Sequence, residues 1–120
     1  MSDGPTASRE LNLLRLLSVS AVLIAEAGPA TGQTFELPVQ FSRVVLGRGA
    51  VATWPILDTD MSRAHAAIEW RPDGHYLLDL ASKNGTMVNG RSVDPDGPGI
   101  LLWHGAWIAL GETVLRYEQR

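Results

Sequence analysis

The chain has 120 residues, of which 45% are hydrophobic, and this is enough apolar material for one packed domain. Ten Lys and Arg residues against 13 Asp and Glu give a formal charge of −3, which excludes the basic balance of a typical nucleic-acid binder. The absence of cysteine excludes disulfides and thiolate metal sites and is compatible with a reducing compartment, so we expect a cytoplasmic protein.

The N-terminal segment, residues 1–17, is expected to precede the folded domain, which we place at residues 18–120. Residues Met1–Arg9 are polar and read as a tail. Glu10–Leu17 is rich in leucine, and this short run predicts either a short helix that packs on the domain or an extension of the first strand.

An apolar run at Leu16–Ala25 is preceded by arginines and followed by Ala25-Glu26-Ala27, a pattern similar to a signal-peptide cleavage site. The run is too short, and too interrupted by Ser18 and Ser20, to span a bilayer. A β-strand explains it better, and we expect no membrane association.

Most of the remaining chain alternates short apolar runs with turn residues. The runs are Val19–Glu26, Thr34–Leu37, Arg43–Leu46, Ala64–Trp70, Tyr76–Leu80, Thr86–Val88, Ala106–Leu110 and Thr113–Tyr117. Asn89-Gly90 predicts a type I′ hairpin turn, because both residues tolerate positive φ. Many short strands without intervening helices predict an all-β sandwich.

Polar residues and glycines are concentrated in the predicted loops between Gly47 and Gly90. They are Gly47-Arg48, Ser62-Arg63-Ala64-His65, Asp79, Ser82-Lys83-Asn84-Gly85-Thr86 and Asn89-Gly90. Loops present side chains to ligands, and an arginine, a hydroxyl, a lysine and an amide are groups that bind phosphate or a peptide backbone. The pattern indicates a phosphate-binding site.

These residues and their spacing resemble the forkhead-associated (FHA) domain, a β-sandwich that binds phosphothreonine peptides through loops at one end. The resemblance runs from about Ala21 to Tyr117 and includes Gly28-Pro29 to Gly32, which is similar to the family's opening hairpin. It implies an antiparallel β-sandwich of about eleven short strands. It also implies a non-enzymatic adaptor whose partner is phosphorylated on threonine by a Ser/Thr kinase.

The resemblance assigns five residues to phosphopeptide binding: Arg48, Ser62, Arg63, Lys83 and Asn84. Arg48 would be the main phosphate ligand, because a guanidinium grips two oxygens at once. Ser62 would donate its hydroxyl to the phosphate, Arg63 would contact the peptide beyond the phosphothreonine, and Asn84 would hold the peptide backbone. The alternatives that composition alone favours are an Arg48 that is simply exposed in a loop and an Arg48 that is paired with Asp58 or Asp60.

Lys83 departs from the common family pattern, since many members carry a small hydroxyl residue at this position. A lysine can still offer a mobile point charge to the phosphate.

Five further residues are expected to be structural: Gly47, His65, Gly85, Asn89 and Gly90. Ser62, His65 and either Asp58 or Asp79 could be assembled into a hydrolase triad, but no Gly-x-Ser-x-Gly elbow surrounds Ser62, so we expect no enzyme. The histidines include no close His/Glu pair, and we expect no metal and no cofactor.

Two features of the sequence stay open. The apolar loop Val51–Pro55 could contact the peptide through Trp54, or Trp54 could fold back on the sandwich. An alternative function is a phosphate-independent structural or oligomerisation domain that uses this loop or Glu10–Leu17, and we expect a monomer or a weak dimer.

Overall fold

The computed structural model describes residues 19–38 and 43–120, and within them it contains eleven β-strands and no α-helix. The strands are β1 (Val19–Ala27), β2 (Thr34–Pro38), β3 (Arg43–Gly47), β4 (Trp54–Pro55), β5 (Ala66–Arg71), β6 (Gly74–Asp79), β7 (Thr86–Val88), β8 (Arg91–Ser92), β9 (Ile100–Leu101), β10 (Trp107–Leu110) and β11 (Thr113–Gln119). The expected helix or strand extension within residues 1–17 lies outside the described residues. In the described ranges, no helix has the length and apolar character needed to cross a membrane.

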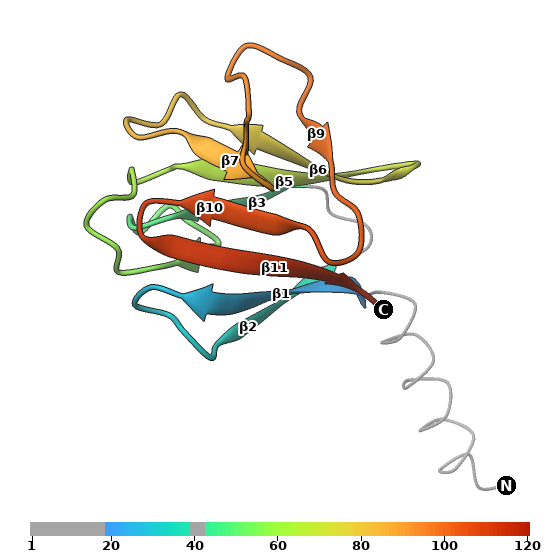
Figure 1. Cartoon of the computed structure of the whole chain (residues 1–120), viewed down its shortest axis with the longest axis horizontal. Helices are drawn as coiled ribbons and strands as arrows, with labels where there is room; N and C mark the ends of the chain where they lie inside the picture. Colours follow the sequence, from blue (N-terminus) through green and yellow to red (C-terminus); the bar gives the residue numbers. More distant parts are fainter. Residues whose placement is uncertain (1–18, 39–42) are drawn as a thin grey trace, which may run out of the picture.

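The strands form two sheets that pack face to face (Figure 1). One sheet has six strands in the order β2-β1-β11-β10-β7-β8, and the other has five in the order β4-β3-β5-β6-β9. The pairings are antiparallel apart from β3 with β4, which run parallel with Leu46 opposite Trp54. The predicted all-β sandwich is confirmed.

The core lies between the sheets because inward-facing positions alternate along each strand. On β6, His75, Leu77 and Asp79 are buried while the residues between them are partly exposed. On β11, Leu115 and Tyr117 are buried in the same alternating way. This period of two is the signature of strands with one face on a core.

Asn89-Gly90 joins β7 to β8, with Val88 opposite Arg91 in the ladder. Both turn residues have positive φ, 47° for Asn89 and 79° for Gly90, as a type I′ turn requires. Asn89 also accepts a hydrogen bond on Oδ1 from the backbone N–H of Trp107 at 2.7 Å, which ties the turn to β10.

The connections after β3, β4 and β6 lie together at one end of the sandwich, opposite the end at which β11 finishes (Figure 1). β1 begins beside the end of β11, with Ala21 opposite Gln119. The ends of the folded domain are therefore kept away from the three loops that carry the polar motif.

Candidate functional site

The three neighbouring loops enclose a polar pocket with a volume of about 360 Å³. It is lined by Arg48, Thr59, Asp60, Met61, Ser62, Lys83 and Asn84. Four of the five residues predicted to bind phosphopeptide thus share one pocket, although they are spread over 37 positions from Arg48 to Asn84 inclusive. Arg63, the fifth, does not line it.

Arg48 follows the last residue of β3, and its backbone and side chain are both tied to the β4–β5 loop. Its N–H donates to the carbonyl of Ser62 at 3.1 Å, and its side-chain Nε donates to the carbonyl of Met61 at 2.8 Å. The Nε contact orients the guanidinium and leaves its two terminal nitrogens for a ligand. In the part of the chain that the structure describes, Arg48 forms no ion pair with Asp58 or Asp60.

Ser62 bridges two loops through its side-chain oxygen. The oxygen accepts a hydrogen bond from the backbone N–H of Lys83 at 3.0 Å. A hydroxyl that accepts one bond still has its own proton to donate. Ser62 can therefore hold the β6–β7 loop and donate to an anion in the pocket at the same time.

His65 is fully buried and joins the same two loops from beneath. Its Nδ1 accepts a hydrogen bond from the backbone N–H of Ser62 at 3.0 Å, so its Nε2 carries the proton and donates to the carbonyl of Gly85 at 2.8 Å. The ring thus contacts the backbone of Ser62 and not its hydroxyl. This geometry lacks the nucleophile–base hydrogen bond on which a hydrolase triad depends.

Asp79, at the end of β6, organises the β6–β7 loop. Its carboxylate accepts hydrogen bonds from the backbone and hydroxyl of Ser82, at 3.0 and 2.6 Å, and from the hydroxyl of Thr86 at 2.6 Å. The hydroxyl oxygen of Ser82 in turn accepts from the backbone N–H of Gly85 at 2.9 Å. Burial acts to raise the pKa of Asp79, but the bonds from Ser82 and Thr86 outweigh it and hold the pKa below its ordinary value.

Asn84 lies at the exposed tip of the β6–β7 loop. Its side-chain Nδ2 donates to the carbonyl of Asp60 at 2.8 Å, which fixes the amide against the β4–β5 loop. The amide retains its oxygen as an acceptor and a second N–H as a donor. These are the two groups needed to hold an extended peptide backbone.

Gly47 is required for close approach of β3 to the β4–β5 loop. A Cβ built on Gly47 would lie 2.1 Å from the carbonyl oxygen of Arg63. The backbone of Arg63 therefore packs against the glycine, and its exposed side chain stands outside the pocket. Gly85 serves differently, because it adopts a φ of 82° at the end of the β6–β7 loop.

Trp54 folds back on the sandwich and does not face the pocket. It is 8% exposed, and its ring stacks on Phe35 with 5.2 Å between the ring centroids. Val51, in the β3–β4 loop just before it, is 73% exposed. Of the two alternatives for Trp54, the structure shows the one in which its side chain folds back on the sandwich.

Asp58, next to the pocket residue Thr59, anchors the β4–β5 loop to the start of β11. The sequence analysis did not identify this structural role. Its buried carboxylate accepts from the hydroxyl of Thr113 at 2.7 Å and from the backbone N–H groups of Glu112, at 2.9 Å, and Asp60, at 3.0 Å. Burial acts to raise its pKa, but these bonds outweigh it and the pKa is lowered. The only feature of the nearby sequence that indicates this role is that an Asp side chain can accept a hydrogen bond from the backbone N–H two residues on, as in an Asx turn.

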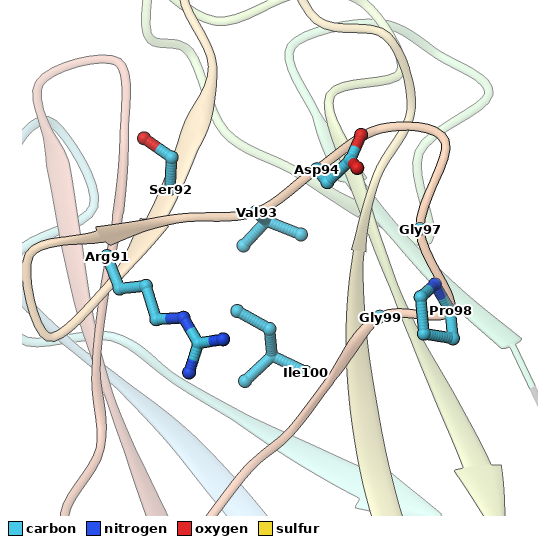
Figure 2. Close-up of a pocket in the computed structure, with 8 residues that line it drawn as sticks. All are labelled: Arg91, Ser92, Val93, Asp94, Gly97, Pro98, Gly99 and Ile100. Atoms are coloured by element: carbon cyan, nitrogen blue, oxygen red, sulfur yellow. The ribbon is translucent and has the colours of Figure 1, made fainter.

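A different pocket, of about 190 Å³, opens between the edge strands β8 and β9 (Figure 2). The Arg91 side chain extends toward Ile100 there, and Asp94 lies on the far side (Figure 2). It includes none of the residues predicted to bind phosphopeptide. Its lining has one arginine and one hydroxyl, that of Ser92, and lacks the lysine and the side-chain amide that accompany Arg48 and Ser62 in the first pocket.

Comparison with known proteins identifies the family of this fold. The sequence profile described as FHA domain matches residues 44–111. The FHA domain-containing protein FhaA of Mycobacterium tuberculosis is 37% identical over 78 residues, which are 62% of this chain and 14% of FhaA. Protein FraH of Nostoc sp. is 34% identical over 90 residues, which are 69% of this chain and 31% of FraH. The chain thus spans less than a third of the length of these relatives.

Two solved structures show the same architecture. One comes from a structural and functional analysis of phosphothreonine-dependent FHA domain interactions. It has a TM-score of 0.73 and 32% identity, covering 84% of this chain and 97% of that chain. The other is the FhaA FHA domain complexed with the intracellular domain of Rv3910, with a TM-score of 0.71 and 31% identity, covering 82% of this chain and all of that chain. With the family profile covering more than half of its length, the chain belongs to the FHA domain family.

Proposed function

We propose that this chain is a phosphothreonine-dependent protein-interaction module that recruits a partner after a Ser/Thr kinase has phosphorylated it. The observation that carries the proposal is the convergence of Arg48, Ser62, Lys83 and Asn84 on one pocket. The similarity to an FHA domain solved in the study of phosphothreonine-dependent interactions supports it.

Arg48 and Ser62 would bind the phosphate. The guanidinium of Arg48 has two free terminal nitrogens for two phosphate oxygens, and the hydroxyl of Ser62 has one proton for a third. Lys83 would add a mobile positive charge at the rim, from a side chain that is exposed. The backbone contacts that hold these residues are already formed, which reduces the entropy lost on binding.

The strength of these contacts makes the interaction depend on the phosphate. Each charge-assisted hydrogen bond contributes roughly 1.5–3 kcal/mol. Micromolar binding corresponds to about 8 kcal/mol, so three or four such bonds account for most of it. An unphosphorylated peptide would retain little beyond the contacts of Asn84 with its backbone.

Selectivity for phosphothreonine over phosphoserine depends on one methyl group. Transfer of that group from water contributes only about 0.8 kcal/mol. A larger preference would require close packing around the methyl group in the bound state. Arg63, beside the pocket, is proposed to contact residues that flank the phosphothreonine.

FHA domains are interaction modules and not enzymes, and we propose the same for this chain, in a cytoplasmic setting and as a monomer or weak dimer. The separation of the Ser62 hydroxyl from the ring of His65 agrees with this proposal.

Titration with a degenerate phosphothreonine peptide library tests the proposed function. Matched unphosphorylated and phosphoserine libraries are the controls. Binding confined to phosphorylated peptides, and strongest for phosphothreonine, is the expected result. Equal binding of the unphosphorylated library would contradict the proposal.

A further inference from the structure

The outer face of the six-stranded sheet carries apolar side chains where a solvated sheet face ordinarily carries polar ones. On β10, Ile108 and Leu110 are buried in the core, so Trp107 and Ala109 point outward. On β7, Met87 lies between two buried residues and also points outward. Trp107 is 43% exposed and Met87 is 39% exposed. Two large apolar side chains therefore lie on the surface of the domain.

Pairing across the strands joins these side chains into one patch. Ala109 lies opposite Met87 on β7 and opposite Val114 on β11. In the next row, Arg116 of β11 lies between Trp107 and Ile24. Tryptophan, methionine and arginine are enriched in protein–protein interfaces, and a cluster of exposed apolar side chains marks such a surface. We call this patch the β10 face, and it consists of Ile24, Met87, Trp107, Ala109, Val114 and Arg116.

Arg116 is held within the β10 face by two carboxylates of the same sheet. Its Nε donates to Glu26 at 3.3 Å, and a terminal nitrogen donates to Glu118 at 2.6 Å. Such bonds use the edge of a planar guanidinium and leave its faces open to stack on an aromatic ring. Because the charge of Arg116 is already balanced, a partner that covers it need not supply a carboxylate.

The cross-strand pairs make the β10 face complementary to itself. A two-fold axis that runs parallel to the strands, between β10 and β11, exchanges the outward positions of these two strands. Such an axis places Trp107 of each copy over Arg116 of the other and Ala109 of each copy over Val114 of the other. An arginine over a tryptophan ring is a favourable contact, and the smaller aliphatic pair lets the two sheets approach. A two-fold interface requires a patch that matches itself in this way.

We propose that the β10 face is the interface of a two-fold symmetric dimer of this chain, with Trp107 and Arg116 as its central contact. The patch has far fewer residues than the roughly 20–30 per partner of a standard interface. The dimer is therefore weak and forms at protein concentrations on the order of 0.1–1 mM. It does not depend on the proposed function, because none of these side chains lines the phosphate pocket.

The direction of the axis has a consequence for binding. The loops that enclose the phosphate pocket lie at one end of the sandwich (Figure 1). A two-fold axis parallel to the strands keeps both pockets at the same end of the dimer. Under the proposed function, a ligand with two phosphothreonines then binds both copies at once, which raises its apparent affinity.

Sedimentation velocity of the full chain without ligand, at concentrations from about 0.02 to 2 mM, tests the dimer. Trp107→Thr removes the ring and keeps a residue that favours strands. Ala109→Glu places a charge in the middle of the β10 face, against Val114 of the other copy. Trp103→Thr is the matched control, because Trp103 is 46% exposed but lies between β9 and β10, outside the β10 face. Circular dichroism checks that each variant is folded.

We expect the wild-type chain and Trp103→Thr to approach the mass of a dimer within this range. Trp107→Thr should weaken the association about 10-fold or more, and Ala109→Glu should stay monomeric. A wild-type chain that is monomeric throughout refutes the dimer, and a dimer that survives both Trp107→Thr and Ala109→Glu refutes this interface.

Titration with a peptide that carries one phosphothreonine separates this inference from the proposed function. Monomeric Ala109→Glu should bind that peptide as tightly as the wild-type chain does, because the phosphate pocket is unchanged. Peptide binding by a chain that never dimerises leaves the proposed function standing and refutes the dimer. A dimer that binds no phosphothreonine peptide refutes the proposed function and leaves the interface standing.

Discussion

The backbone N–H of Lys83 donates a hydrogen bond to the side-chain oxygen of Ser62 at 3.0 Å, although the two residues are 21 positions apart. This bond fixes the β6–β7 loop against the β4–β5 loop and uses Ser62 only as an acceptor. The remaining proton of the hydroxyl is the one proposed to bind phosphate. One side chain thus shapes the pocket and offers a ligand group.

Substitution of Ser62 by alanine should weaken phosphopeptide binding about 10-fold or more, because a charge-assisted bond of roughly 1.5–3 kcal/mol is lost. The free energy of unfolding should fall by only about 0.5–1.5 kcal/mol, from the lost bond to Lys83. Calorimetric titration and urea unfolding measure the two effects. Ser92→Ala, at an exposed serine on β8, is the control and should change neither. Equal affinities for the wild-type chain and Ser62→Ala would remove Ser62 from the proposed ligand set.

Substitution of His65 by alanine should destabilise the domain by about 2–4 kcal/mol. The change leaves a cavity in place of the imidazole ring. It also removes the acceptor of the Ser62 N–H and the donor to the Gly85 carbonyl, two backbone groups that the ring of His65 links. Urea unfolding measures this loss of stability. The control is His104→Ala, since His104 is exposed and accepts a single bond from the backbone of Gln119. If His65→Ala lowers the free energy of unfolding no more than His104→Ala does, the ring of His65 does not hold the loops together.

Replacement of Gly47 by alanine should destabilise the domain by at least about 3 kcal/mol, because the new methyl group would meet the backbone of Arg63. The comparison is Gly97→Ala, where the nearest atom to an added Cβ would lie 3.3 Å away. Thermal unfolding of the two variants separates a steric requirement from a general effect of replacing glycine. Comparable melting temperatures would show that β3 and the β4–β5 loop can move apart at little cost.

The stability of the domain should fall in acid. Burial opposes ionisation of Asp58 and Asp79, but hydrogen bonds from Thr113 to the first and from Ser82 to the second prevail, and both pKa values lie below the ordinary 3.8. A carboxylate with a lowered pKa in the folded state stabilises the fold above its unfolded pKa, and this contribution is lost as the pH falls through the folded pKa. The contribution of these two carboxylates to the urea midpoint should therefore be complete above about pH 5 and be lost as the pH falls below about 4.

Asp79→Asn provides the matching control for the acid prediction. The variant keeps the shape of the side chain but has no carboxylate to titrate, so it should be less stable than the wild type at neutral pH and lose less stability on acidification. A parallel acid dependence for the two proteins would show that Asp79 is not one of the groups responsible.

Most of the fold could be predicted because the longer strands carry a readable pattern. Runs such as Val19–Glu26 and Thr113–Tyr117 appear as β1 and β11 to within two residues. The two-residue strands β4, β8 and β9 have no periodicity of their own and form only where a neighbouring strand pairs with them. The parallel pairing of β3 with β4 was likewise invisible in the sequence.

The lining of the pocket could be anticipated where the resemblance to the FHA domain marks a position, as with Arg48 and Asn84, because composition alone favoured a different reading of Arg48. Asp58 was not identified as an anchor, because its partner Thr113 is 55 positions away and only the packed sheets bring them together.

The central claim is that Arg48 binds a phosphate in the pocket between the three loops. Calorimetric titration of a phosphothreonine peptide into the wild-type chain, Arg48→Ala and Arg91→Ala tests it most directly. Arg91→Ala removes the same charge from the other pocket, so it controls for net charge (Figure 2).

We predict that Arg48→Ala, still folded by circular dichroism, loses phosphopeptide binding by about 100-fold or more, and that Arg91→Ala binds as the wild type does. Unchanged affinity of a folded Arg48→Ala would contradict the claim and favour a domain that has kept the FHA fold without its phosphate-dependent ligand.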